Sequence, residues 1–530
     1  MILKKEKASH GILEDLDARN HNWNLIEQPF HFDEDLGEYV NVSKFWDGMK
    51  NGKIYTVEFN QFSVTPNPDG IKKDDNEGLV VIPSTASEAN RDDYDKIGLF
   101  KSIDVNAYVD EDDIYHITAI KGDGRFKSDG TNGDVYVMSM VGYQKKYSDD
   151  EVWGISYSDT MHPEFEPLHE AVMIDGRIRP YLLHAKYIAG INPKDGKLAS
   201  ISGVPAEYAA MSHNDQITKF KSKGTQYSGK TTHDDYYVQL MVWLKYATTN
   251  SQSVLYGATS AYYLQYTNKV AENGVNRVII TNDQASNLLI GSTVSIGDYT
   301  GGSSSTDRQA AVNYNLANRV LVTEIEDVGG GNSAVYVASD TFDTTLNTTI
   351  TTYPYNSGYC DSVLGRDGSP VNPLSGKEPF IINGIEIMIG GYEVIQNLII
   401  QNNATDNRID VYVNYDASTY ATSITSAYTL AGQIASTNNV WQYISEIDMP
   451  QDHSSVILPI ATDASSSTGF ADGLYSNPPS TGGTRVWLSL GNLSHGATAG
   501  LRPVYGNSAL SFSYWLILGR LSATGRSKGV

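Results

Sequence analysis

Short hydrophobic runs separated by turn residues dominate the first third of this chain. Between residues 49 and 179 the β-branched or aromatic runs are KIYTVEF, GLVVIPS, YHITAI and DVYVMSMVGY, and turn-rich clusters such as TPNPDG and KKDDNEG lie between them. Short runs of this kind, bounded by Gly, Pro, Asn and Asp, are typical of β-strands joined by turns. The pattern therefore predicts a β-rich domain over residues 49–179.

One longer hydrophobic run has a different character. The segment THDDYYVQLMVWLKYA (232–247) is apolar on nearly every side, and only Gln239 and Lys245 interrupt it. A helix that is apolar all round is buried. Thr231 or Thr232 can cap its first turn, and the acidic residues Asp234 and Asp235 in that turn are stabilised by the positive end of the helix dipole. We therefore expect a buried helix with Trp243 in the core.

The string GTQYSGKT (224–231), directly before this helix, fits the phosphate-loop pattern G-x-x-x-x-G-K-[ST]. A working phosphate loop follows a buried strand and ends at a helix N-terminus that faces the phosphates. The preceding stretch, QITKFKSK, is too polar for such a strand, and Asp234 and Asp235 would repel a triphosphate. No strand ending in an Asp for magnesium is evident either. The string therefore indicates a turn and a helix cap rather than a nucleotide site.

Changes in composition divide the chain further. Residues 1–48 form a polar N-terminal segment with a short predicted helix, a segment suited to attachment to another protein. Residues 261–355 are rich in Thr, Ser and Asn, and NRVIIT and NRVLVT repeat within them. We interpret this part as an inserted small β-barrel that can be deleted, joining 260 to 356. Residues 180–260 and 356–530 then form one domain around it.

The overall composition limits the possible partners and compartments. The 530 residues carry a net charge of −23, which disfavours nucleic-acid binding through phosphate neutralisation. The only cysteine is Cys360, so no intramolecular disulfide can form. We find no signal-peptide h-region and no apolar stretch long enough to span a membrane. The 35 Tyr residues against 13 Phe suit either a recognition surface or solvated sheet faces, and both interpretations stay open.

Catalytic and metal-binding motifs are weak. The chain has no G-x-S-x-G and no H-E-x-x-H motif. HPEFEPLHE (162–170) gathers two His and three Glu, but its prolines prevent a helix that would present them together, so we expect a surface loop. DGTNGD (129–134) could hold Ca²⁺ but lacks EF-hand spacing, and a solvated turn is the simpler interpretation. A glycosidase carboxylate pair can be neither identified nor excluded from the sequence.

Three segments in order resemble a known family. They are the helix DDYYVQLMVWLKYATTNSQ (234–252), the Gly-rich GIEIMIGGYEVIQN (384–397), and the run RVWLSLGN…GLRPVYGN…YWLILGRLSATGR near residue 526. This order resembles the C-type-lectin-like fold shared by formylglycine-generating enzymes and variable receptor-binding proteins of some phages. The block from RPYLLHAKYIAG to LKYATTNSQS is also similar to structural proteins of phages that infect Gram-positive bacteria. The expected fold class is therefore mainly β, with an α+β C-type-lectin-like domain over 180–260 plus 356–530 and an inserted β-barrel.

The resemblance also implies which branch of the family applies. The enzymes hold copper with two cysteines, and a single Cys360 cannot provide that site, so we expect a binding protein without catalytic residues. In the phage members, exposed side chains near the C-terminal end contact the receptor. We expect Arg502 and Tyr505 to be the most exposed, and Trp487 and Trp515 can instead belong to the core. The matching receptor-binding candidates are Asn492, His495, Arg502, Tyr505, Asn507, Tyr514 and Trp515.

The functional hypothesis is a phage virion protein of a tail or fibre that adsorbs to a bacterial surface glycan or protein. Such a protein is assembled in the host cytoplasm, is commonly a homotrimer, and contacts other virion proteins through its N-terminal segment. We expect no cofactor, with Ca²⁺ as the one ion worth testing, and no binding to nucleic acid or insertion into membranes. The alternatives are a structural virion component without receptor binding, such as a head fibre or baseplate protein, and a carbohydrate-active enzyme.

Overall fold

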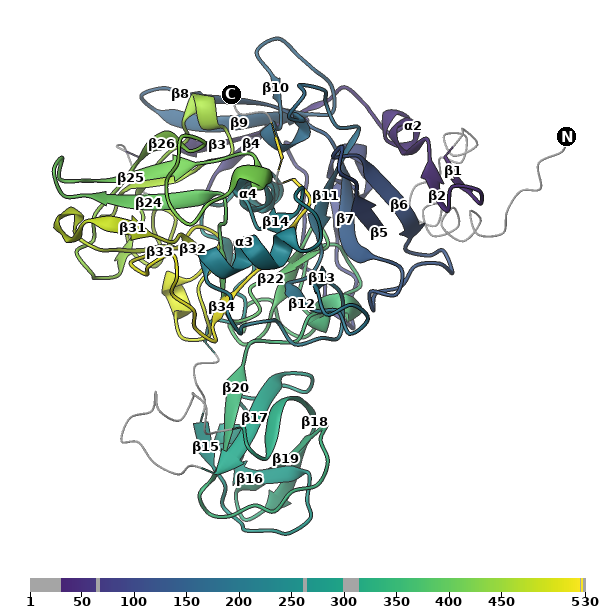
Figure 1. The fold of residues 1–530 in the computed structure, drawn as a ribbon, viewed down its shortest axis with the longest axis vertical. Helices are drawn as coiled ribbons and strands as arrows, with labels where there is room; N and C mark the ends of the chain where they lie inside the picture. Colours follow the sequence, from purple (N-terminus) through teal and green to yellow (C-terminus); the bar gives the residue numbers. More distant parts are fainter. Residues whose placement is uncertain (1–29, 63–66, 261–264, 299–313, 525, 528–530) are drawn as a thin grey trace, which may run out of the picture.

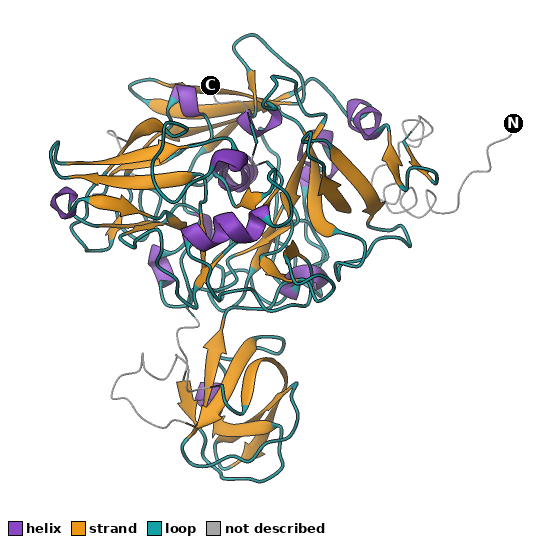
Figure 2. Ribbon diagram, in the orientation of Figure 1, coloured by secondary structure: helices purple, strands orange, loops and turns teal. Residues whose placement is uncertain are grey.

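The chain is mainly β, and strands dominate the ribbon while helices are few (Figure 2). The computed structural model describes residues 30–62, 67–260, 265–298, 314–524 and 526–527. The helix predicted near the start of the N-terminal segment lies outside these residues. What is described of that segment is β1 (His31–Asp33), β2 (Glu38–Val40) and α2 (Val42–Asp47). In the described part of the chain, no helix is long and apolar enough to cross a membrane.

The predicted β-rich region contributes to two sheets. The first has the order β10 (Glu166–Pro167), β8 (Tyr143–Ser148), β9 (Val152–Ser158), β3 (Ile54–Asn60) and β4 (Ile71–Asp74). The second has the order β14 (Ser228–Gly229), β35 (Leu521–Ser522), β11 (Tyr181–Ala185), β7 (Asp134–Met140), β5 (Ser102–Val109) and β6 (Tyr115–Ile120). This second sheet runs across residue 180, where the sequence analysis places a domain border. The run GLVVIPS forms isolated bridges rather than a strand, because Val81 and Ser84 pair with separate loops.

The predicted buried helix is confirmed as α4 (Thr232–Tyr246), which lies at the centre of the main body (Figure 1). The carboxylate of Asp234 accepts hydrogen bonds from the backbone N–H and the hydroxyl of Thr231, at 2.9 Å each, and so closes the first turn. Trp243 is fully buried. Its ring lies 5.1 Å from that of Trp153 and 6.4 Å from that of Phe59, so α4 packs directly on the first sheet. A second helix, α3 (His213–Lys221), begins with a Ser212 cap.

The part of the chain after residue 356 builds two further sheets. The first has the order β27 (Gln442–Tyr443), β30 (Gly473–Ser476), β33 (Val504–Gly506), β32 (Leu488–Ser489), β23 (Tyr392–Val394) and β34 (Ile517–Leu518). The second has the order β26 (Thr429–Ile434), β25 (Arg408–Val413), β24 (Leu398–Asn403) and β31 (Gly483–Arg485). Three strand pairs complete the body: β12 (Ala189–Ile191) with β13 (Leu198–Ser200), β21 (Phe380–Ile382) with β22 (Ile385–Ile387), and β28 (Glu446–Asp448) with β29 (Leu458–Ala461).

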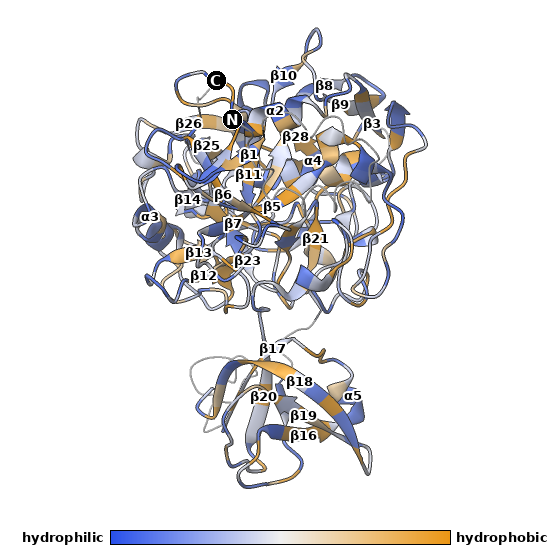
Figure 3. Ribbon diagram, turned by 90° about the vertical axis from the view of Figure 1, so that its right-hand side faces the viewer, coloured by the Kyte–Doolittle hydropathy of each residue, from blue (hydrophilic) through white to orange (hydrophobic). Residues whose placement is uncertain are grey.

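The described residues between 265 and 353 form a separate sheet with its own hydrophobic cluster, which we call the inserted unit. Its strands are β15 (Gln265–Thr267), β20 (Thr348–Tyr353), β17 (Thr293–Asp298), β18 (Ala317–Gly329), β19 (Asn332–Val337) and β16 (Arg277–Thr281), in that order, and it also contains α5 (Asn282–Ala285). Figures 1 and 3 show it below the main body on a narrow connection. The predicted closed barrel is wrong. Among the described residues, β15 pairs with β20 and β16 pairs with β19, and these two edge strands do not pair with each other.

The two ends of the inserted unit are anchored side by side on the main body. The N–H of Ala258 donates to the carbonyl of Met388 and the N–H of Tyr355 donates to that of Ile389, both at 2.9 Å. Tyr355 itself is buried in a cluster of the main body with Ile188 and Ile389. The border at residue 355 therefore lies inside the main body, and the inserted unit ends nearer residue 353.

Deleting residues 261–352 and bridging the ends with a short Gly-Ser linker is expected to leave a folded main body, because the hydrophobic clusters are separate. Deleting 261–355 should cost at least about 3–5 kcal/mol more, because it also removes the buried rings of Tyr353 and Tyr355 from the main body. Thermal unfolding followed by tryptophan fluorescence measures both, since residues 261–355 contain no tryptophan. Unfolding of the shorter deletion would show that the main body depends on the inserted unit.

Candidate functional site

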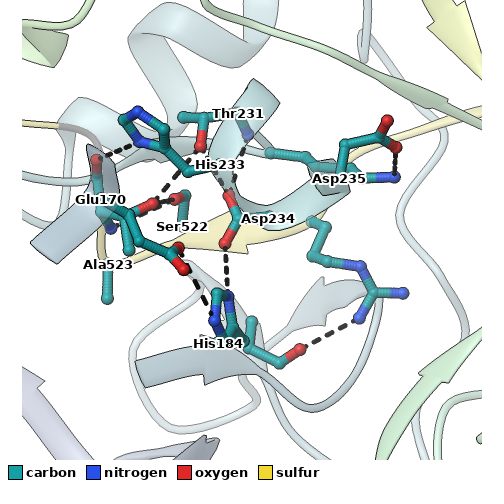
Figure 4. Close-up of polar contacts among 12 residues, drawn as sticks. Glu170, His184, Thr231, His233, Asp234, Asp235, Ser522 and Ala523 are labelled. Atoms are coloured by element: carbon teal, nitrogen blue, oxygen red, sulfur yellow. Dashed lines mark hydrogen bonds and ion pairs between the residues drawn. The ribbon is translucent and has the colours of Figure 1, made fainter. Parts of the chain in front are cut away.

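The string GTQYSGKT does not form a phosphate loop. Lys230 is buried and its amine pairs with Asp235 at 2.8 Å and with Glu393 at 3.3 Å. The N-terminus of α4 is already occupied by the carboxylate of Asp234 (Figure 4). Since a phosphate would need both the lysine and the helix N-terminus, no nucleotide loop forms here. The predicted helix cap is confirmed, and the predicted turn is correct except at Ser228–Gly229, which form β14.

A buried polar network surrounds the same end of α4 (Figure 4). His184 on β11 lies between two carboxylates, with Nδ1 at 3.3 Å from Asp234 and Nε2 at 3.7 Å from Glu170. Burial alone would lower the pKa of His184, but the two carboxylates outweigh it and raise that pKa. Burial raises the pKa of Glu170 to about 7, whereas the hydrogen bond from His184 and its charge overcome burial and hold the pKa of Asp234 at about 2. All three side chains are closed off from solvent, so we interpret the network as structural.

The segment HPEFEPLHE is only partly the surface loop that was expected. Glu164 and Glu166 are exposed, but His169 and Glu170 are buried. The expectation failed for these two because His169 meets His233 of α4 at 2.9 Å and Glu170 faces His184. The histidines and glutamates of the segment therefore point to different partners rather than to one ion.

Both carboxylates of the candidate calcium segment DGTNGD are already engaged by other groups of the protein. Asp129 accepts hydrogen bonds from the N–H and hydroxyl of Thr131, at 3.0 and 2.7 Å. Asp134 is buried and pairs with Lys223 at 2.9 Å. Among the described residues, no group of three or more His, Cys, Asp or Glu side chains is arranged to hold a metal ion.

The receptor-binding candidates separate into two groups in the structure. Arg502 was expected to be exposed but is buried, because its guanidinium forms an ion pair with Asp235 of α4. Trp515 is also buried, and its ring lies 4.9 Å from that of Tyr353, where the inserted unit meets the main body. Tyr514 packs half-buried beside Trp515. Asn492 is buried and holds the turn that leads to His495. These four side chains support the fold rather than form an open surface.

The other candidates, His495, Tyr505 and Asn507, lie near one another at a half-buried aromatic group. Tyr505 on β33 stacks on Tyr475 of β30, with ring centroids 5.2 Å apart and planes within 18°. The strands pair in parallel with these two residues in register, so both rings stand on the same face of the sheet. Asn507 hydrogen-bonds to Tyr505 through its side chain.

Trp441 completes this group from the loop before β27. Its ring lies 4.8 Å from the ring of His495, 5.4 Å from Tyr475 and 5.8 Å from Tyr505. We call the half-buried side chains Trp441, Tyr475, His495 and Tyr505 the aromatic surface. Gly473 allows this arrangement, because a Cβ there would lie 2.6 Å from the Trp441 ring. Of the six tryptophans in the described residues, Trp441 is the one that is not buried.

The imidazole of His495 is fixed by two hydrogen bonds. The backbone N–H of Asn492 donates to Nδ1 at 3.3 Å, which places the ring proton on Nε2, where Tyr392 Oη lies at 2.9 Å. Burial lowers the pKa of His495 to about 4, so the ring is neutral at physiological pH. The aromatic surface is therefore uncharged, with ring faces and neutral polar groups side by side.

Sequence reasoning found His495, Tyr505 and Asn507 but missed Trp441 and Tyr475. Both lie in the long stretch between 398 and 485, for which the sequence analysis names no site residue. A single tryptophan within such a stretch, NNVWQY (438–443), was the available signal. The sheet that brings it beside Tyr505 could not be derived from the local pattern.

Comparison with known proteins adds no assignment: no protein-family model matches the chain, and a search of curated proteins finds no match.

Proposed function

We propose that this protein is a virion recognition protein of a phage and that it binds a bacterial surface glycan through the aromatic surface. The observation that carries the proposal is the cluster of Trp441, Tyr475 and Tyr505, which are only half-buried although their rings contact one another. The C–H faces of sugar rings pack against the electron-rich faces of aromatic rings, and hydroxyls bind the polar groups beside them. The resemblance to receptor-binding proteins of a C-type-lectin-like fold supports the virion role.

The proposal includes the oligomeric state and the place of action expected from the resemblance. A homotrimer would present three aromatic surfaces to one cell wall and would strengthen a weak individual site through effective concentration. The N-terminal segment would attach the protein to the particle. The proposed activity is binding without turnover of the glycan.

Replacing Trp441 with alanine is expected to weaken binding to isolated Gram-positive cell walls about 10- to 100-fold. A central aromatic residue in a binding site commonly contributes about 2 kcal/mol or more, and Tyr475→Ala should act in the same direction. Binding of the labelled full-length protein to a panel of walls measures the effect. Tyr108→Ala is the matched control, because Tyr108 is an exposed tyrosine on β5, outside the aromatic surface.

Full-length variants are preferable to a truncation at residue 355. Such a truncation would remove β35 from the second sheet and Arg520 from the core, so loss of binding would report unfolding. If the protein binds walls and Trp441→Ala binds equally well, the receptor site lies elsewhere. If it binds no walls but still forms oligomers, the structural virion alternative takes precedence.

A further inference from the structure

The charges around the aromatic surface limit the kind of glycan that it can accept. Between residues 427 and 518 the only lysine or arginine residues are Arg485 and Arg502. Arg502 is buried against Asp235, and Arg485 donates from Nε to Asn477 at 2.7 Å and from Nη1 to the carbonyl of Thr484 at 2.8 Å. Arg502 is therefore enclosed by the protein, and two of the three nitrogens of the half-buried Arg485 guanidinium already donate to the protein.

The described segment 251–260, which neighbours this region, adds no cation. Residues 251–260 pack on this region through Gln252, which donates to the carbonyl of Gly496, and contain no charged residue. Under the surface, Tyr392 is followed by Glu393, which is buried and neutralised by Arg520 and Lys230. The chain as a whole carries a net charge of −23, which repels anionic polymers where no local cation compensates.

The polar side chains that contact these rings, or lie next to them in the sequence, are neutral. The side-chain amide of Asn507 lies beside the Tyr505 hydroxyl, and Gln442 follows Trp441 and accepts a hydrogen bond from Thr462 at 2.6 Å. Asn439, two residues before Trp441, is exposed. Amides both donate and accept, so they match sugar hydroxyls and N-acetyl groups, whereas carboxylates and phosphates favour arginine and lysine.

We infer that the ligand of the aromatic surface is an uncharged glycan of hexose or N-acetylhexosamine units, and not an anionic wall polymer. This inference rests on the proposed function and narrows it to one chemical class. Recognition then depends on ring stacking and neutral hydrogen bonds, so affinity should be nearly independent of salt.

The test uses the full-length protein and wall glycans from a strain to which it binds, separated by anion exchange into neutral and anionic pools. Isothermal titration calorimetry follows binding, because a fluorescence signal from Trp441 would be lost in the Trp441→Ala variant whether or not ligand binds. We expect titration with the neutral pool to give a saturable signal that Trp441→Ala abolishes. Its midpoint should change less than about twofold between 50 and 500 mM NaCl. Arg485→Gln should bind like the unmodified protein.

The other outcomes show whether the neutral-glycan inference alone fails or the proposed binding site fails with it. Binding of the anionic pool alone, dependent on Trp441 and weakened more than about tenfold by salt or by Arg485→Gln, would overturn the neutral-glycan inference and leave glycan recognition in place. Binding of either pool that is unaffected by Trp441→Ala, or no binding of either pool, would overturn the proposed site itself and the inference with it.

Discussion

Replacing Arg520 with methionine is expected to lower the free energy of unfolding by about 3–5 kcal/mol. Arg520 is buried and forms an ion pair with Glu393 at 2.7 Å. Its guanidinium also donates to the carbonyls of Glu386 and Ala185, at 2.6 and 3.1 Å. Without it, Glu393 keeps only Lys230 at 3.3 Å, and the two carbonyls lose a buried donor. The free-energy cost comes mainly from leaving a buried carboxylate and two buried carbonyls without the Arg520 donor, rather than from loss of the attraction between Arg520 and Glu393.

Chemical denaturation followed by tryptophan fluorescence measures this change. The matched control is Arg177→Met, because Arg177 pairs with Asp175 at 2.6 Å on the surface, where an ion pair contributes at most about 1 kcal/mol. Combining Arg520→Met with Glu393→Leu should recover part of the lost stability, since no buried carboxylate then lacks a partner. A loss below about 1 kcal/mol for the single variant would mean that water replaces the guanidinium.

Replacing Lys245 with methionine should cost a similar free energy, about 3–5 kcal/mol at pH 8, and distinctly less at pH 5. Lys245 lies in the last turn of α4, buried, with its amine 2.6 Å from Asp367 and 3.5 Å from Asp92. Burial already raises the pKa of Asp92 to about 6, even though Lys245 opposes that shift. Removing the lysine raises this pKa further, because both carboxylates lose their cation.

The direction of the pH dependence follows from proton binding. In the Lys245→Met variant the folded state holds a proton on Asp92 at a pH where the unfolded state, with a pKa near 3.9, has released it. The free energy of unfolding of the variant therefore rises relative to the unmodified protein as the pH falls from 8 to 5. Denaturation of both proteins at the two pH values measures it. An equal loss at pH 5 and pH 8 would show that Asp92 is not the group responsible.

Local patterns predicted the elements whose structure depends on their own residues. The helix α4 was recognisable because apolar side chains cover all of its sides and Thr231 and Asp234 form its cap. The runs around Ile54–Asn60 and Asp134–Met140 were recognisable as strands because they are short, β-branched or aromatic, and bounded by turn residues. The strand predicted at GLVVIPS did not form, because in the described part of the chain this run makes only isolated bridges to loops. The absence of a partner strand cannot be predicted from composition.

Properties that depend on distant residues were not predictable. Arg502 stands in a loop rich in Gly and Pro, which indicated exposure, but Asp235 lies close to it in space and buries it. The aromatic surface joins residues 441, 475, 495 and 505 only through the pairing of β30 with β33 and the position of Gly473. Half of the aromatic surface could be named from the sequence, because His495 and Tyr505 lie within the third segment that carries the family resemblance. Trp441 lies outside the three segments.

The place of β35 in the second sheet has a consequence for synthesis of the protein on the ribosome. Leu521 and Ser522 lie between β11 and β14, where Ser522 pairs with His184 and with Ser228. Until residue 522 has left the exit tunnel, the edge of β11 stays unpaired in the nascent chain, and an open edge is a site of aggregation. The described strands of the inserted unit pair with one another, so this unit can fold during translation. We therefore expect the main body to depend on chaperones late in synthesis, while the inserted unit does not.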